Sequence, residues 1–398
     1  MALPTEWRMR VENWLKELPR HFYRPLGSVA LSGFTTTSHL SLAQALTHSF
    51  APVTPGARWG AKWEYGWFQG EIELPPAAAG HRIVLCVDVG AESLVWINGQ
   101  IEGARDRQHR EITLADRGVA GARYQVVVEG YAGHGPQVVY AGPTPLGRDT
   151  VPEPDPTQVT LGETTYGIWE ELAYQLWLDV VTLYEVRENL DPLSLRVQEI
   201  DQALRDFTVI VDFELPYDEM MATMQAARER LSGPLACVNG STTPTMFAFG
   251  HAHIDVAWLW PLAETERKTA RTFGNQLALM AEYPEYRFLQ SQPHLYHMLK
   301  ARYPELYERV KTAIRDGQVI PDGSTWVEPD TNVPSGESLI RQFVYGKRFY
   351  QDEFGADCEL LWLPDVFGYS GALPQIMRGC GVRFFSTQKI FWAYHGGD

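Results

Sequence analysis

The sequence predicts a multidomain protein of the α/β plus β class: an N-terminal β-sandwich, a helical connector, and then part of a β/α barrel. Three observations predict this class. The 398 residues are too many for one ordinary domain. Short β-rich runs separated by Gly, Pro and Asn fill residues 26–142. Residues 244–398 instead alternate between strand-like and helical patterns, which is typical of a parallel sheet covered by helices.

The N-terminal part divides into a helical arm, residues 1–25, and a sandwich, residues 26–142. The arm has helical apolar spacing over residues 5–22. In the second part the strand-like runs are GWFQGEIELP, HRIVLCVDVG, SLVWINGQ and RYQVVVEGY. Asn98 and Gly99 between apolar runs are a strong hairpin signal. We therefore expect a jelly-roll-like β-sandwich.

Three aromatic residues near the start of one run, Trp63, Tyr65 and Trp67, have two interpretations. They could form a platform on which a sugar ring stacks. Packing in the core or between domains is the favoured interpretation, because most aromatic side chains in a globular protein are buried.

Residues 143–243 are expected to hold a proline-rich linker and a helical connector. The linker is GPTPLGRDTVPEPDPTQ, in which Pro and Gly act against regular structure. Residues 165–232 show helical apolar spacing, most clearly in WEELAYQLWLDVVTLYEVREN and YDEMMATMQAARERL.

Residues 244–398 are expected to form a partial barrel. In order, we expect strand TMFAFGHAH, helix 264–283, strand YRFLQSQ, helix 294–316, strand QVIPDGSTWVE, helix 336–354 capped by Ser335, strand ELLWLPD, helix 372–380 and strand RFFSTQKI. Five strands cannot close a barrel, which usually needs about eight. We therefore expect the chain to stop inside the barrel and to be catalytically silent alone. Further polypeptide or a second copy of the chain would then cover the open sheet edge.

The composition excludes several classes of partner. A net charge of −15 disfavours binding to nucleic acid or to an anionic membrane, since both require basic surfaces. No run reaches the roughly 18 apolar residues of a membrane span, and the N-terminus lacks the apolar core of a signal peptide. The four cysteines are far apart and have no CxxC pair, which is typical of a reducing compartment. We expect a cytoplasmic protein.

Polar residues recur where each predicted strand ends. In parallel α/β barrels the chemistry is built at the carboxyl ends of the strands, so this distribution predicts an active site. The residues are His253 and Asp255, Gln290 and Gln292, Glu328 and Asp330, Asp365, and then Gln388 and Lys389.

The segment FGHAHIDVAWLW, residues 249–260, carries the sharpest signal. Residues two apart in a strand point the same way, so His251, His253 and Asp255 would share one face. Imidazole and carboxylate are ligands that zinc accepts. The alternative is two histidines held by backbone carbonyls, with Asp255 capping the next helix. Three potential ligands on one face favour a metal site.

Two further carboxylates each have more than one possible role. Asp365, in WLPDVFGYSGALPQI, could be a metal ligand, a nucleophile, a general acid/base or a helix cap. Glu328 is evenly divided between support of its loop and a hydrogen bond to substrate.

Four motifs together carry a family resemblance: GHAHIDVAWLW, WVEPDTNVPSGESLIRQ, LWLPDVFGYSGALPQIM and FFSTQKI. They resemble the catalytic domain of family 38 α-mannosidases, and most closely the cytosolic and vacuolar class II branch, which has an N-terminal β-rich region. The resemblance is strong over residues 244–398 and weaker before them. It implies a seven-stranded β/α barrel of which this chain holds the first part.

The resemblance also implies roles for individual residues. His253 and Asp255 match the pair that binds the catalytic zinc, or cobalt in some members. Asp365 matches the nucleophile of a retaining mechanism and also lies beside the metal. Trp258 matches the residue on which the mannose ring stacks, and Lys389 falls at a basic substrate contact. Glu328 is kept as a substrate-binding candidate. His251 receives no ligand role, and the remaining histidine ligand and the acid/base carboxylate are expected downstream of the chain.

The implied function is that of a retaining exo-α-mannosidase that removes terminal α-D-mannose from oligosaccharides during glycan catabolism. The metal would bind sugar hydroxyls as a template rather than activate water. One rival is a metal-dependent carbohydrate deacetylase or amidohydrolase on a similar barrel, in which the cation activates water. Another is a non-catalytic protein that binds carbohydrate through the sandwich.

Overall fold

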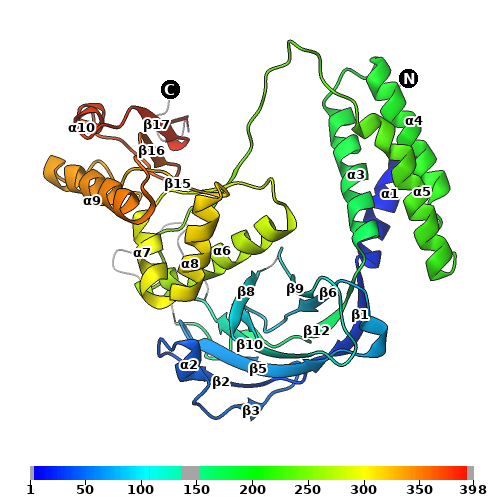
Figure 1. Cartoon of the computed structure of the whole chain (residues 1–398), viewed down its shortest axis with the longest axis horizontal. Coiled ribbons are helices and arrows are strands. Elements are labelled where there is room, and N and C mark those ends of the chain that lie inside the picture. The colour runs from blue at the N-terminus through cyan, green and yellow to red at the C-terminus, as the bar shows by residue number, and fades with distance from the viewer. Residues whose placement is uncertain (1–3, 107, 136–152, 392–398) are drawn as a thin grey trace.

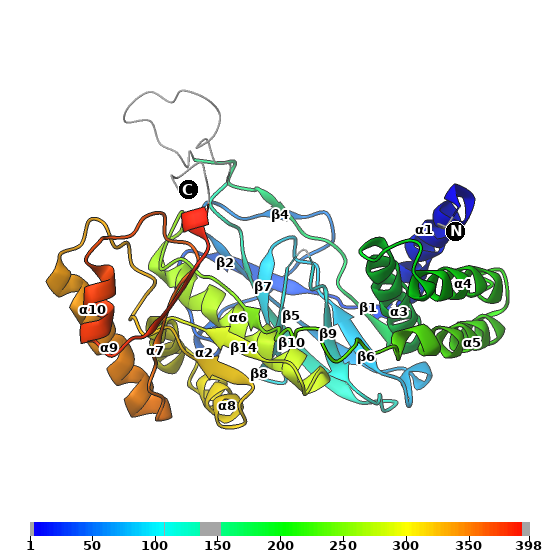
Figure 2. The same cartoon turned by 90° about the horizontal axis from the view of Figure 1, so that it is seen from above.

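The computed structural model of the chain describes residues 4–106, 108–135 and 153–391, and has a β-sandwich between a helical bundle and a mixed α/β part (Figures 1 and 2). The helical bundle lies at one end of the molecule, and helices α9 (Gly336–Phe354) and α10 (Leu373–Gly379) lie at the other. The proline-rich linker predicted over residues 142–158 falls largely outside the described residues.

The sandwich consists of two antiparallel sheets. One has the strand order β3-β2-β5-β10-β7-β8 and the other the order β1-β12-β6-β9, and β4 pairs with β11 beside them. The bounds are β1 Tyr23–Ser28, β2 Ser32–Thr36, β3 Ala51–Pro52, β4 Arg58–Trp59, β5 Tyr65–Glu73, β6 Ile83–Cys86, β7 Glu92–Ile97, β8 Gln100–Arg105, β9 Glu111–Ala115, β10 Arg123–Tyr131, β11 Val159–Thr160 and β12 Thr165–Trp169. The short helices α2 Leu42–Ala45 and η2 Pro76–Ala78 interrupt them.

The six-stranded sheet is buried on both faces, which explains the continuous apolar run in β10. Val126 and Val128 point into the core between the two sheets. Val127, between them, points the other way into a second core shared with helices of the α/β part. Successive strand residues face opposite sides, so a central strand covered twice needs apolar residues at every position.

The predicted hairpin is confirmed. β7 and β8 pair antiparallel across Asn98 and Gly99, whose φ angles are 52° and 85°. Positive φ at both central residues is the requirement of a type I′ turn, which Asn-Gly meets at low cost.

One element of the connector is a correction to the sequence analysis. Helical structure was expected from residue 165, but Thr165–Trp169 forms β12 and lies between β1 and β6 in the four-stranded sheet. The helix begins at Glu171 instead. The strands that pair with β12 lie far earlier in the chain, and the local apolar spacing contains no information about such distant pairing.

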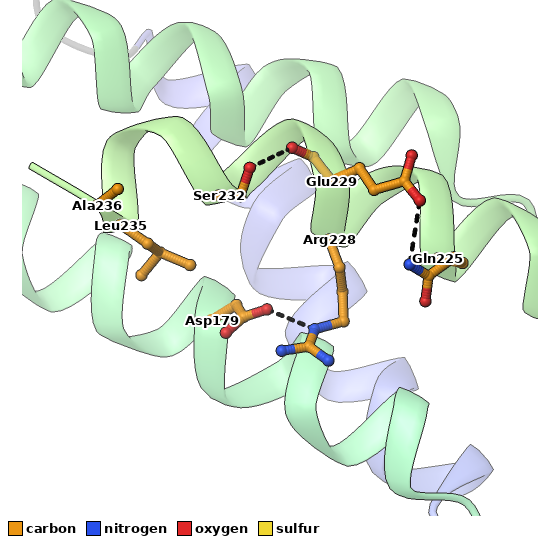
Figure 3. A pocket seen from close by; sticks show the side chains of 7 residues that line it. All are labelled: Asp179, Gln225, Arg228, Glu229, Ser232, Leu235 and Ala236. Carbon is orange, nitrogen blue, oxygen red and sulfur yellow. Dashed lines mark hydrogen bonds and ion pairs between the residues drawn. The ribbon is translucent and has the colours of Figure 1, made fainter.

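The helical bundle joins the N-terminal arm to the connector. It consists of α1 Thr5–Glu17, η1 Leu18–His21, α3 Glu171–Glu188, α4 Leu195–Ile210 and α5 Tyr217–Leu235. Their apolar faces share one core, which includes Leu18, Leu176 and Phe207. An open cavity of about 510 Å³ lies between α3 and α5, where Arg228 Nε bonds Asp179 Oδ2 at 2.7 Å (Figure 3).

The α/β part has two parallel sheets, and no closed barrel is present among the described residues. One sheet pairs β13 Gly250–His251, β14 Phe288–Gln290 and β15 Val319–Pro321, and the other pairs β16 Leu360–Leu363 with β17 Phe384–Thr387. The helices are α6 Leu262–Glu282, α7 Pro293–Arg302, α8 Pro304–Arg315, α9 Gly336–Phe354 and α10 Leu373–Gly379, followed by η3 Lys389–Phe391.

Three predicted elements of this part were wrong in extent. The third strand was expected over QVIPDGSTWVE, residues 318–328, but only Val319–Pro321 pairs with β14. The first strand was expected from residue 245, but only Gly250 and His251 pair with β14, and Met246 and Phe247 are 91% and 86% exposed. The helix expected over 294–316 is broken at Pro304, which has no N–H to donate and disfavours helical backbone in Tyr303 before it.

The aromatic residues of β5 pack between the sandwich and the α/β part. Trp67 is fully buried, and its ring stacks on Trp96 at a centroid distance of 5.4 Å. Tyr65 is 3% exposed, whereas Trp63 is partly exposed beneath the Lys62 ammonium. Burial supports the packing interpretation for Tyr65 and Trp67, whereas Trp63 is 41% exposed and does not fit it.

Candidate active site and metal centre

Three side chains that could bind a metal converge from two strand ends. His253 and Asp255 follow β13, and Asp365 follows β16. His253 Nε2 lies 3.3 Å from Asp255 Oδ1 and 3.5 Å from Asp365 Oδ2. One potential ligand atom from each of the three residues lies within 4.8 Å of the others. The structure thus brings together the local pair predicted from the motif and a carboxylate more than a hundred residues away.

Glu328 orients the imidazole of His253. Its carboxylate accepts hydrogen bonds from His253 Nδ1 at 2.7 Å and from Ser291 Oγ at 2.8 Å. The Glu328 side chain is only 3% exposed, so both oxygens are engaged inside the protein. A carboxylate on Nδ1 fixes the ring and leaves Nε2 for a metal, an arrangement common around zinc-binding histidines. This geometry favours loop support, one of the two roles that the sequence left open for Glu328.

The charges of the cluster suit a divalent cation. Burial lowers the pKa of His253, but hydrogen bonds to Asp255 and Glu328 and their negative charges outweigh burial and raise it to about 10. The ring therefore already sits in a strongly negative field. Three carboxylates against the Lys389 ammonium leave two negative charges when His253 is neutral. One imidazole and two carboxylates are a donor set that zinc or cobalt accepts, so the residues present fit such an ion.

Two glutamines hold the backbone on either side of His253. Gln290 Nε2 donates to the Ala252 carbonyl at 3.1 Å, and Gln292 Nε2 donates to the Ile254 carbonyl at 2.8 Å. Gln292 Oε1 also accepts the backbone N–H of Glu328 at 3.1 Å. The sequence analysis placed both glutamines at a strand end but gave them no role. Their spacing of two at the end of β14, which in extended backbone turns both side chains the same way, is the signal that could have found it.

Lys389 lies directly beside Asp365. Its Nζ is 2.7 Å from Asp365 Oδ1, and its side chain is mostly buried, 4.6 Å above the ring of Phe367. Lys389 begins η3, two positions after the last residue of β17, and β17 pairs with β16, which ends two residues before Asp365. The parallel pairing of the two strands brings their carboxyl ends, and hence these two side chains, together.

Trp258 lies in the loop between the metal-binding residues and α6. Its side chain is 54% exposed, and it contacts Trp260 edge-to-face at 5.8 Å. Trp260 is itself fixed by a hydrogen bond from Nε1 to Thr265 Oγ1 at 3.0 Å. An exposed ring held in this way offers an apolar face to solvent, which suits stacking against a sugar.

Two other candidates lie outside the cluster. His251 packs against Trp362 at 5.1 Å, and its buried Nε2 has no hydrogen-bond partner among the described residues. Burial, with the nearby charge of His253, lowers the pKa of His251 to about 4 and keeps it neutral. Asp330 accepts the backbone N–H groups of Asn332 and Val333 and so stabilises its own turn.

Two family models match this chain, one over the α/β part and one over the sandwich. Residues 243–396, which hold the whole cluster, match the glycosyl hydrolases family 38 N-terminal domain. The chain belongs to glycosyl hydrolase family 38. Residues 28–142 match the jelly roll domain of α-mannosidase, which agrees with the sandwich predicted over 26–142.

Several curated relatives are similar to this family 38 chain. Alpha-mannosidase 2C1 of Homo sapiens is 35% identical over 366 residues, which are 91% of this chain and 34% of that protein. Alpha-mannosidase G of Dictyostelium discoideum is 33% identical over 89% of this chain and 32% of that protein. The α-mannosidase of Saccharomyces cerevisiae is 47% identical over 37% of this chain and 14% of that protein. The chain spans about a third of the length of the first two relatives.

Helices long and apolar enough to cross a bilayer are absent from the part of the chain that the structure describes.

Proposed function

We propose that this family 38 chain supplies the metal-binding part of a retaining exo-α-mannosidase acting on terminal α-D-mannose of oligosaccharides. The observation that supports the proposal is the convergence of His253, Asp255 and Asp365 at the strand ends of a domain shared with α-mannosidases. The α-mannosidases named above, to which the chain is similar over most of its length, suggest the substrate.

His253 Nε2 and the carboxylates of Asp255 and Asp365 would hold the ion, zinc or cobalt. When bound, such an ion would supply a positive template for two adjacent sugar hydroxyls. Glu328 keeps the Nδ1 proton of His253 in place, and Gln290 and Gln292 hold the surrounding backbone. The cluster is open to solvent on one side, since the three ligand side chains are 27%, 36% and 32% exposed.

Asp365 would act as the nucleophile. One of its carboxylate oxygens forms a bond to the anomeric carbon as the bond to the leaving oxygen breaks, and water later releases the sugar with retained configuration. The Lys389 ammonium forms an ion pair with Asp365 Oδ1 at 2.7 Å. Trp258 presents an exposed ring on which the mannose could stack. Glu328 is buried and doubly bonded, so we assign it no acid/base role.

We further propose a cytoplasmic location. All four cysteines, Cys86, Cys237, Cys358 and Cys380, are free in the structure, as expected of a protein from a reducing compartment.

The proposed activity is tested with p-nitrophenyl α-mannoside and a fluorinated mannosyl trap. Both are applied to the chain alone and to a chimera in which the remainder of the human relative continues it. The proposal expects metal-dependent turnover by the chimera and labelling of Asp365 by mass spectrometry. Deacetylation of a mannosamine derivative without a covalent sugar adduct would instead support the rival in which the cation activates water.

A further inference from the structure

Helix α6 connects the sandwich to the metal-binding loop. It begins at Leu262, directly after the loop that holds His253, Asp255 and Trp258. Along its length it packs against strands β7 and β8 of the six-stranded sheet, and both views show it lying over that sheet (Figures 1 and 2). A shift of α6 relative to the sandwich would therefore move the start of the helix, and the loop attached to it.

Buried polar contacts, and not only apolar packing, fasten the first turns of α6 to the sandwich. Tyr65 donates from its hydroxyl to Glu264 Oε2 at 3.2 Å. Arg267 Nε donates to Glu129 Oε1 at 2.6 Å, and both of these side chains are at most 3% exposed. The Arg267 guanidinium also lies over the Tyr65 ring, 3.6 Å from its centroid. Arg271 closes the set through an ion pair to Glu264.

These contacts restrict α6 more tightly than apolar packing would. A buried ion pair or charged hydrogen bond needs a particular distance and direction, and an unpaired partner in the interior is costly. Apolar surfaces can slide by a small amount at little cost. Tyr65 and Glu129, on β5 and β10, therefore define the rotation and height of the start of α6 above the sheet.

A single threonine links the start of α6 to the loop. Thr265 is fully buried in the first turn. Its Oγ1 accepts the indole N–H of Trp260 at 3.0 Å and lies 3.4 Å from the backbone carbonyl of Asp255, to which it donates. Trp260 in turn contacts Trp258. Thr265 thus contacts the backbone of Asp255, a candidate metal ligand, and the side chain of Trp260, which supports the candidate stacking residue Trp258.

We propose that Tyr65 and Glu129 of the sandwich are positioning residues for the metal-binding loop, residues 253–260, and that they act through Glu264, Thr265 and Arg267 of α6. The inference rests on the proposed metal site for its functional meaning. It assigns the sandwich a role beyond packing against the α/β part: its six-stranded sheet sets where Asp255 and Trp258 lie.

The test uses mild variants that keep size and shape: Tyr65→Phe, Glu129→Gln and Thr265→Val. The matched control is Asp201→Asn, which removes the negative charge that lies 2.7 Å from Arg187 Nε in the core of the helical bundle. Two measurements are made on each. Hydrogen exchange by mass spectrometry reports the backbone of residues 253–260 without metal, and visible absorption during a cobalt titration reports the ligand geometry and affinity.

All three variants are expected to exchange faster in residues 253–260, to bind cobalt up to roughly 10-fold more weakly and to shift its absorption bands. The control should lose thermal stability but match the wild type in both measurements. A loop that exchanges at the wild-type rate in all three variants overturns the positioning role. Faster exchange in the variants, together with a wild-type chain that binds no cobalt, overturns the metal site but supports the positioning of the loop.

Discussion

His253 Nδ1 lies 2.7 Å from Glu328 Oε2, and this contact turns the opposite ring nitrogen towards Asp255 and Asp365. The carboxylate can only accept, so it determines that Nδ1 carries a proton. Because Ser291 holds the other oxygen of Glu328, the carboxylate cannot rotate freely. The cluster is thus prepared for a cation by residues that would not touch that cation.

Replacing Glu328 by Gln should weaken metal binding about 10–100-fold, the usual effect of removing a carboxylate behind a ligating histidine. The amide retains an oxygen for Nδ1 but loses the negative charge that strengthens the imidazole as a ligand. Competition with a chromophoric chelator measures the affinity. The control is Glu337→Gln, a solvent-exposed acid near the start of α9 that pairs with Arg341. Equal affinity of the Glu328 variant and the wild type would remove the orienting role.

Replacing Gln292 by Met should destabilise the protein and loosen the loop at His253. Gln292 is buried and bonds the Ile254 carbonyl and the Glu328 N–H. Each buried group left without a partner costs about 1–3 kcal/mol. Differential scanning calorimetry should show a lower Tm for the unfolding transition of the α/β part. Gln198→Met, at an exposed site, is the control, and an unchanged Tm in the Gln292 variant would show that its contacts are dispensable.

Stability at mildly acidic pH should depend on His39. Burial, with the charges of Arg267 and Arg302, lowers the pKa of His39 from 6.5 to about 3. The neutral ring can still donate from Nδ1 to Glu266, 3.3 Å away. Since the unfolded chain binds this proton more tightly than the folded one, stability is lost as the pH falls below 6.5 towards 3.

His39→Asn should therefore show a shallower fall of Tm between pH 7 and pH 4 than the wild type. Ser38→Ala, one residue away and exposed, should follow the wild-type curve. Parallel curves for the His39 variant and the wild type would contradict the assignment of this pH dependence to His39.

Elements whose start and end signals are local were predictable from the sequence. Helix α9 was expected over 336–354 and spans Gly336–Phe354, because Ser335 caps its start and Gly355 adopts a left-handed φ of 68° at its end. β12 was missed because what makes it a strand is pairing with β1 and β6, distant in the chain. The first strand of the α/β part was drawn too long for a related reason, since strand length depends on where a partner strand begins.

The residues of the candidate site also divide into those with a local sequence signal and those placed by long-range contacts. His253 and Asp255 are two residues apart, so their shared direction follows from strand geometry alone. In the sequence, only the family resemblance linked Asp365 and Lys389 to this pair. In the structure, the parallel pairing of β16 and β17 brings the two side chains together. The role of Glu328 stayed open because it depends on Ser291 and His253, which only the folded chain places around it. Sequence pattern identifies chemically capable residues, whereas their partners come from tertiary structure.

The most direct test of the central claim is the metal content of the chimera described above, which continues the chain with the remainder of the human relative, and of four variants of it after cobalt or zinc loading and gel filtration, measured by elemental analysis. The variants are His253→Ala, Asp255→Asn, Asp365→Asn and, as a control, Asp330→Asn, whose carboxylate accepts the backbone N–H groups of Asn332 and Val333 and is not one of the three clustered ligands. The account predicts about one metal ion per chain in the unsubstituted chimera and the control, and near zero in the other three. Unchanged metal content in those three variants would show that this cluster is not the metal centre.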